Sequence, residues 1–378
     1  MKTDIEFKLN KISDIWNRFI WDYRYCSNKI KFDDDVKTNY FGDILGYFQD
    51  TFDIVFKTEK LPHEYYEKFS HTISFLQAIY IQQDFVEEML GVFKTGIDKG
   101  QLKKDSSYSI NRDIRNELIG HPIRKLGGKL ISSTLFSYQT VSNQIQYLRY
   151  HIDNDFRFES KTHLISDIRE RHKNFLERYF DEILLKLRLI LDEYLKELQK
   201  LETVIEKHEF PTVLKLVDLY FEAIFKSDFC YDKKSLLKIY ELKDKHQRYR
   251  NFIHRFYDDL KEALFDKRSS VYEIYNRKIT DYSNISNEDI SKIEIAFSHS
   301  TEKERSNDQI DRSYHYEIGK IATKRNPVDF DFFGGILRGE CKDNDLVQNE
   351  LNHMERNIDD EIEYYTSLRL ICKELNEE

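Results

Sequence analysis

Apolar residues recur at intervals of three and four along most of the chain, which predicts a mainly helical protein. Residues 4–30 and the segment from Phe41 to Val55 carry two such stripes. A third stripe follows Pro62, which suits the first turn of a helix, and it ends before Gly96 and Gly100. Its apolar members are Phe69, Ile73, Leu76, Ile79, Phe85, Met89 and Phe93.

The pattern changes after Gly127-Gly128. Residues 130–138 and 145–152 are short segments, the first rich in Ser, Thr and aromatics, and they predict two strands joined by Gln139–Asn143 as a β-hairpin. No glycine follows until Gly319, and Pro211 is the only proline in that interval. Because both residue types destabilise helix interiors, their scarcity permits unusually long helices.

The longest predicted helix is the apolar stripe from Ile165 to Ile205, which we expect to pack as core or as a coiled-coil seam. Pro211 predicts the start of another helix, to about Phe229. The apolar patterns of residues 235–265 and 343–376 predict two more helices. The polar residues 283–313 predict a mobile loop, and residues 326–339, with Gly334-Gly335, a structured turn region.

Composition limits the partners of the chain. The net charge is 59 − 68 = −9, so a nucleic acid would have to be held by a local basic patch. No apolar run reaches the ~18 residues of a membrane helix, and the acidic N-terminus does not resemble a signal peptide, so we expect no membrane partner. The widely spaced cysteines predict reduced, mostly buried thiols of a cytoplasmic protein. They are Cys26, Cys230, Cys341 and Cys372.

Residues 109–128 combine a phosphate-binding cation, an amide and an imidazole near a predicted helix end. Arg115 is followed directly by Asn116 and, six residues on, by His121, which lies between Gly120 and Pro122. Six residues at 100° each put Arg115 and His121 about 120° apart on an ideal helix. Gly120 favours a helix end and Pro122 disfavours the α conformation for His121. We therefore expect the imidazole to turn toward the Arg115 face.

The same segment carries a local excess of positive charge. Within residues 112–129 the basic side chains exceed the two acidic ones by three; they are Arg112, Arg115, Arg124, Lys125 and Lys129. Two other Arg–His pairs have the same spacing, Arg157 with His163 and Arg248 with His254, but the residues after these arginines are Phe158 and Tyr249. Only Arg115 has a small polar neighbour.

An Arg followed by four to six residues and a His, with Asn directly after the Arg, resembles the signature of the HEPN superfamily of helical ribonucleases and nucleotide-binding domains. The resemblance covers residues 1–128. It implies a HEPN-like helical bundle there, and with the hairpin and long helices predicted from the pattern the expected fold is mainly all-α: this bundle, a small β-hairpin insertion and a long-helix C-terminal region. The expected domains are the HEPN-like domain 1–128, the hairpin 129–158 and a long-helix region 159–378 of unknown role.

The resemblance also implies a metal-independent endoribonuclease that needs no cofactor. Arg115, Asn116 and His121 would be catalytic, and Arg112, Arg124 and Lys125 would bind the RNA. The ribose 2′-OH would attack, leaving 2′,3′-cyclic phosphate and 5′-hydroxyl ends. Two protomers of such proteins pair their motif helices, so the resemblance implies a homodimer, and many members are toxins or antiviral abortive-infection effectors. An inhibitory or activating protein partner would fit such a role.

Two other interpretations stay open. Arg115 could pair with a surface acid while Gly-His-Pro merely ends a helix, and the chain would then be a non-catalytic module for dimerisation, nucleotide binding or scaffolding. Arg248–Arg255 mixes cations with aromatics, which is compatible with RNA binding, but a solvated helix face is the better interpretation. Asp329 and Asp331 have no histidine near them in the sequence and predict no metal site.

Overall fold

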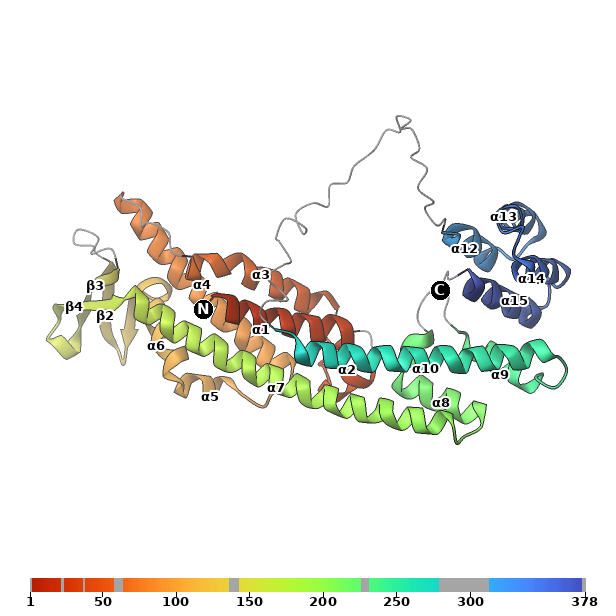
Figure 1. Ribbon diagram of the computed structural model, residues 1–378. Coiled ribbons are helices and arrows are strands. Elements are labelled where there is room, and N and C mark those ends of the chain that lie inside the picture. Colours follow the sequence, from red (N-terminus) through yellow and green to blue (C-terminus); the bar gives the residue numbers. More distant parts are fainter. Residues whose placement is uncertain are drawn as a thin grey trace, which may run out of the picture. The chain divides into compact units, whose positions relative to one another are not determined.

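The computed structural model describes residues 2–21, 24–36, 38–57, 64–135, 143–225, 231–278 and 313–375. Over these residues the protein is mainly helical and has a small antiparallel sheet, which confirms the expected mainly all-α fold (Figure 1). The chain divides into two compact units. Unit 1 is Met1–Tyr194 with Ile274–Asn284, and unit 2 is Leu195–Glu273 with Ile285–Glu378.

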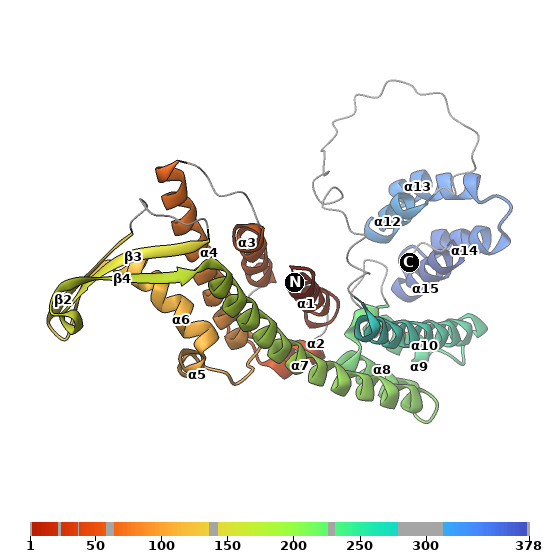
Figure 2. The same ribbon diagram turned by 60° about the vertical axis from the view of Figure 1, so that its left-hand side comes forward.

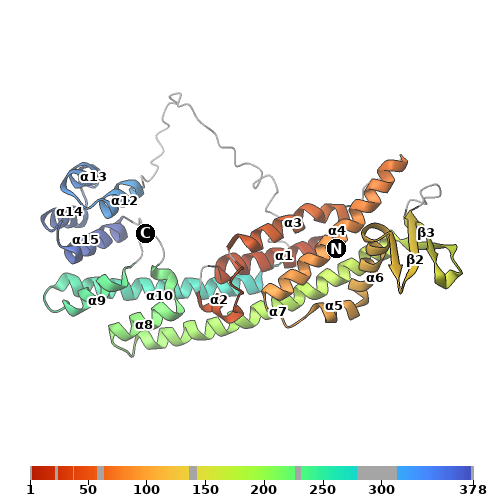
Figure 3. The ribbon, with the colours of Figure 1, turned by 180° about the vertical axis from the view of Figure 1, so that it is seen from behind.

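Unit 1 begins with helices that cover the three predicted N-terminal stripes. They are α1 (Lys2–Ile15) with the π-helical turn η1 (Trp16–Ile20), α2 (Arg24–Ile30), α3 (Thr38–Phe56) and α4 (Tyr65–Val92). Two shorter helices follow, α5 (Lys99–Lys104) and α6 (Ser106–Arg115), and a second π-helical turn, η2 (Asn116–Gly120), continues α6. Figure 3 shows α1, α3 and α4 running beside one another. The predicted helical periodicity of this region is confirmed.

Aromatic contacts fill the core of unit 1. Trp16 stacks on Phe41 with ring centroids 4.6 Å apart, and Phe48 of α3 contacts Phe180 of the long helix α7 (Ile165–Ile205) at 5.7 Å. Rings at these separations contribute specific contacts beyond their buried area. The core also holds a polar chain, in which Gln82 donates to Thr51 and accepts from the Nε2 of the fully buried His172.

The predicted hairpin is present, but it is the middle of a four-stranded meander (Figure 2). The strands are β1 (Ile123–Leu126), β2 (Lys129–Leu135), β3 (Gln144–His151) and β4 (Arg157–Leu164), in the order β1-β2-β3-β4, with the short 3-10 turn η3 (Ile152–Asn154) before β4. Gly127 and Gly128, both with positive φ, make the tight turn between β1 and β2. β4 has no buried position, so it lacks the apolar alternation by which a strand is recognised.

The helix predicted from Ile165 to Ile205 is confirmed as α7, which spans 41 residues. Its apolar stripe is buried within this chain, because Ile168, Phe175, Leu187 and Leu198 are 0% exposed. The stripe is therefore core, and it is not a free coiled-coil seam.

Unit 2 corrects three of the helices expected from the sequence. The helix starting near Pro211 ends early, as α8 (Phe210–Tyr220), and is followed by the 3-10 turn η4 (Glu222–Phe225). Residues 235–265 fall in two helices, α9 (Lys233–Glu241) and α10 (Gln247–Asn276). The closing helix is also two, α14 (Asp345–Arg356) and α15 (Glu361–Glu374), because the Asp360 carboxylate accepts from the Ile362 and Glu363 amides and starts a new helix.

The predicted turn region at 326–339 was wrong, since it forms the helix α13 (Pro327–Glu340) after α12 (His315–Thr323). Asn326 caps α13 by accepting from the Asp329 amide at 2.9 Å, and Pro327 occupies its first turn. Gly334 lies against the Phe330 ring, so this packing offsets the low helix propensity of glycine. The loop expected at 283–313 lies outside the described residues, apart from Ser313.

Cys26, Cys341 and Cys372 are buried, as predicted, whereas Cys230 lies outside the described residues. None of the described helices combines the length and the apolar character needed to cross a bilayer.

Candidate active site

The Arg-Asn-His segment lies where α6 ends and the sheet begins, and α4 packs against it. On α4, Gln77, Tyr80 and Asp84 follow one another at intervals of three and four, so they form a polar line along one helix face. On α6, Arg112 and Arg115 are three residues apart and both place their guanidinium over the Tyr80 ring, at 4.1 Å and 3.9 Å. Tyr80 thus separates two cations with different surroundings.

Arg115 is held by neutral groups. Its Nε and Nη2 donate to the Gln77 Oε1 at 3.0 Å and 2.9 Å, and its Nη1 donates to the Asn116 Oδ1 at 3.1 Å. A guanidinium has five N–H groups, so these bonds leave one on Nη1 and one on Nη2 without a partner among the described residues. No carboxylate pairs with Arg115 in the described part of the chain. The half-buried cation is therefore fixed in place and still able to bind an anion.

Gly120 gives the guanidinium room. A Cβ at this position would lie 2.6 Å from the Arg115 Nη1 and 3.3 Å from the Asn116 Oδ1. Those contacts are closer than van der Waals separation, so any larger residue would push the Arg115 side chain away. The glycine expected to end the helix is thus also required for close packing of the arginine.

His121 follows η2, whose wider turn was not foreseen. The His121 amide donates to the Asn116 carbonyl at 2.7 Å, which closes a π-helical i→i+5 turn, and φ −141° then takes the chain out of the helix. Such turns are frequent at functional sites. The imidazole is exposed, and among the described residues no hydrogen bond joins it to Arg115 or to another side chain.

Glu117 ties this turn to the sheet. Its Oε2 accepts from the Tyr147 hydroxyl at 2.7 Å, and its Oε1 lies 3.4 Å from the Arg124 Nη2 and 3.7 Å from the Arg149 Nη1. Burial, together with the bond to this carboxylate, raises the pKa of Tyr147, which therefore stays a neutral donor. β1 and β3 thus hold the η2 backbone, and with it the start of the His121 segment.

The three predicted RNA-binding cations lie in different surroundings. Arg112 is an ion-pair partner of Asp84, and its side chain is only 11% exposed, between Tyr80 and Tyr108. Arg124 donates to the His121 carbonyl at 3.0 Å as well as to Glu117, so it braces the turn. Lys125 is exposed on β1 and is the member of this set most accessible to a ligand.

The other two Arg–His pairs lie in different environments. His163 is half-buried on β4 and stacks with Tyr147 at 5.8 Å; burial and the charge of Arg171 lower its pKa, against the opposing effect of Glu117. Arg248 of α10 pairs with Glu350 at 2.5 Å and with Glu363 at 2.8 Å. Its positive charge is therefore neutralised inside unit 2, which argues against RNA binding by Arg248.

The sequence did not point to Gln77, Tyr80 or Glu117. The only available signal was the line of polar positions within the apolar stripe of α4. The carboxylate of Asp329 accepts from Asn326 and lies 3.7 Å from Lys324, so it belongs to the start of α13. Among the described residues, no group of three or more His, Cys, Asp or Glu side chains is arranged to hold a metal ion.

In comparisons with known proteins, no family model matches the sequence, and no curated protein or solved structure matches the chain.

Proposed function

We propose that the protein is a metal-independent endoribonuclease whose catalytic residues are Arg115, Asn116 and His121. The observation that carries the proposal is the environment of Arg115, a guanidinium held by two amide oxygens and a tyrosine face, to which no carboxylate of the described residues is paired. An exposed imidazole follows at the end of the same turn. A fixed cation and a titratable base are the groups that phosphodiester cleavage by a 2′-OH requires.

Each residue has a distinct role in the proposed reaction. The His121 imidazole, with a reference pKa of ~6.5, takes the proton from the ribose 2′-OH or supplies one to the leaving 5′-oxygen. The 2′-oxygen forms the new bond to phosphorus and the bond to the 5′-oxygen breaks. The two remaining N–H groups of Arg115 stabilise the charge of the phosphorane. Asn116 holds the guanidinium through its Oδ1 and has its amide nitrogen left for the phosphate.

The proposed active species is a homodimer in which two copies of residues 112–125 face one cleft. One chain offers a single fixed Arg115 with no hydrogen bond to His121, and a second copy would increase the positive charge and exclude water, which strengthens each contact. The apolar stripe of α7 is buried in the core of the chain, so the proposed dimer interface has to use another surface. Light scattering measures the mass, and a monomer that cleaves at full rate would contradict the shared cleft.

By its resemblance to HEPN ribonucleases, we place the protein among cytoplasmic toxins or antiviral effectors, with a protein partner controlling the activity. The direct test of the chemistry is incubation of the purified chain with mixed RNA in excess EDTA, followed by mass spectrometry of the ends. We expect 2′,3′-cyclic phosphate and 5′-hydroxyl termini. Products with 3′-hydroxyl and 5′-phosphate ends would indicate a different mechanism. No cleavage, with nucleotide binding retained, would favour the non-catalytic module.

A further inference from the structure

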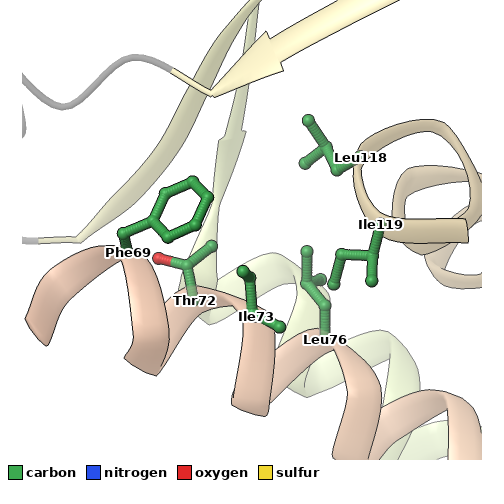
Figure 4. Close-up of a pocket in the computed structure, with 6 residues that line it drawn as sticks. All are labelled: Phe69, Thr72, Ile73, Leu76, Leu118 and Ile119. Atoms are coloured by element: carbon green, nitrogen blue, oxygen red, sulfur yellow. The ribbon is translucent and has the colours of Figure 1, made fainter. Parts of the chain in front are cut away.

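A small apolar pocket opens beside the candidate active site, between α4 and η2 (Figure 4). Its volume is about 150 Å³, and it is lined by Phe69, Thr72, Ile73, Leu76, Leu118 and Ile119. In Figure 4 the α4 side chains project toward Leu118 and Ile119, which close the other side. The Thr72 hydroxyl donates to the Lys68 carbonyl at 2.9 Å, so its hydrogen is already used.

The pocket exists because the apolar stripe of α4 is only partly covered. Leu76 is 1% exposed, whereas Phe69, two turns earlier on the same stripe, is 39% exposed, and Ile73 is half-buried. An exposed apolar concavity next to functional groups is the usual form of a small-ligand site.

The pocket and the Arg115 site share two pieces of backbone. On α4, Leu76 lines the pocket and the next residue, Gln77, binds the Arg115 guanidinium. On η2, Ile119 lines the pocket and the next residue, Gly120, lies against that guanidinium. Consecutive residues of α4 and of η2 therefore line the pocket and contact the guanidinium, and we expect a base in the pocket to lie next to an anion on Arg115.

We propose that this pocket binds a pyrimidine base of the RNA, adjacent to the phosphate held by Arg115. The inference rests on the proposed function and adds a substrate preference to it. A pocket of about 150 Å³ lined mainly by Leu, Ile and Phe has room for one benzene-sized ring, so it fits a pyrimidine better than the two fused rings of a purine. None of the six described side chains that line the pocket is charged, and five of them are apolar.

The test uses the full chain with labelled isoleucine and leucine methyl groups, titrated with four probes. These are uridine 3′-monophosphate, adenosine 3′-monophosphate, uridine and inorganic phosphate. We expect uridine 3′-monophosphate to shift the methyl signals of Ile73 and Ile119 and to bind at least ~10-fold more tightly than the adenosine compound. Free uridine should shift the same signals more weakly, and inorganic phosphate should leave them unchanged.

Two variants separate the pocket from the phosphate site. Ile73→Phe fills the space and should weaken uridine 3′-monophosphate at least ~10-fold while inorganic phosphate binds as before. Phe69→Ala, at the exposed border of the pocket, should keep the fold and weaken the binding of uridine 3′-monophosphate several-fold. Leu130→Phe, on the exposed face of β2, is the matched control and should change nothing.

The outcomes distinguish this inference from the proposed function. Nucleotides that bind through phosphate alone, or an unchanged uridine affinity in Ile73→Phe, would overturn the pocket assignment and leave Arg115 and His121 standing. If free uridine enters the pocket but no phosphate binds, the proposed active site fails, and with it the placement of the base beside a cleaved phosphate.

Discussion

Arg115 and Arg248 are each followed six residues later by a histidine, yet the groups that bind their side chains differ in charge. Arg115 in unit 1 is held by the amide oxygens of Gln77 and Asn116. Arg248 in unit 2 is bound by two carboxylates, Glu350 and Glu363, and by the Ser367 hydroxyl at 2.7 Å. The two Arg–His pairs have the same spacing in the sequence, but carboxylates neutralise the charge of Arg248, whereas neutral amides bind Arg115.

Glu363 binds two other side chains of unit 2 besides Arg248. Burial would raise the pKa of Glu363, but the hydrogen bonds from Tyr249 and His353 and the charge of Arg248 outweigh it and lower that pKa. Glu363 therefore stays ionised and Arg248 stays neutralised. The arrangement joins α10 to α14 and α15, so Arg248 stabilises unit 2, whereas Arg115 keeps a charge for a ligand.

The largest expected effect is on catalysis in unit 1. Arg115→Ala and His121→Ala should each lower RNA cleavage by at least ~10²-fold, because each removes a charge or a proton-transfer group that acts in the transition state. The helical circular-dichroism signal should not change. His163→Ala and His254→Ala are controls that keep wild-type rates, and wild-type rates in the Arg115 and His121 variants would refute the site.

Arg248→Gln should show the reverse behaviour. Removing the Arg248 charge leaves the largely buried Glu350 without its ion-pair partner and takes one of three partners from Glu363, which costs about 3 kcal/mol of unfolding free energy. Denaturant unfolding measures this loss, and cleavage per folded molecule should stay at the wild-type value. A variant that is fully stable but inactive would move the functional site to unit 2.

Gly120→Ala tests, with one added methyl group, whether cleavage depends on the position of the Arg115 guanidinium. The added Cβ displaces the Arg115 guanidinium, which can move at little cost in stability, and alanine suits the helical turn. We expect cleavage to fall at least ~10-fold, since misplacement of a catalytic group by about 1 Å is costly. Gly91→Ala is the matched control, because a Cβ there meets nothing within 4 Å. Equal rates in both variants would show that the position of Arg115 is unimportant.

The smallest expected effect is on the pH dependence of stability, and it comes from His172, which is buried, whereas His121 is exposed. Burial lowers the pKa of His172 to about 3, far below its unfolded value of ~6.5. Between these pH values the unfolded chain binds the extra proton, so this residue makes the protein less stable as the pH falls, by about 1.4 kcal/mol per pH unit. Unfolding of His172→Gln at pH 7, 6 and 5 should show a flatter slope than wild type, and an identical slope would contradict the assignment.

Periodicity was sufficient to predict the helices that cover the three N-terminal stripes and the long α7, because their buried positions repeat every three or four residues. It was insufficient for β4, which has no fully buried position, and for α13, where packing against Phe330 allows a glycine inside a helix. The sequence pointed to Arg115, Asn116 and His121 as a group. It could not point to Gln77 or Glu117, because their importance depends on which elements pack around α6 and η2.

The reaction at Arg115 is tested most directly by single-turnover cleavage of two oligonucleotides of one sequence, all-ribo and all-2′-deoxy, in excess EDTA. The wild-type chain should cut the RNA to 2′,3′-cyclic phosphate ends and leave the DNA intact, because the 2′-OH is the nucleophile. Arg115→Ala in the same assay should cut neither. Cleavage of the DNA at a comparable rate, or cleavage of the RNA by Arg115→Ala at the wild-type rate, would contradict the proposed chemistry of this site.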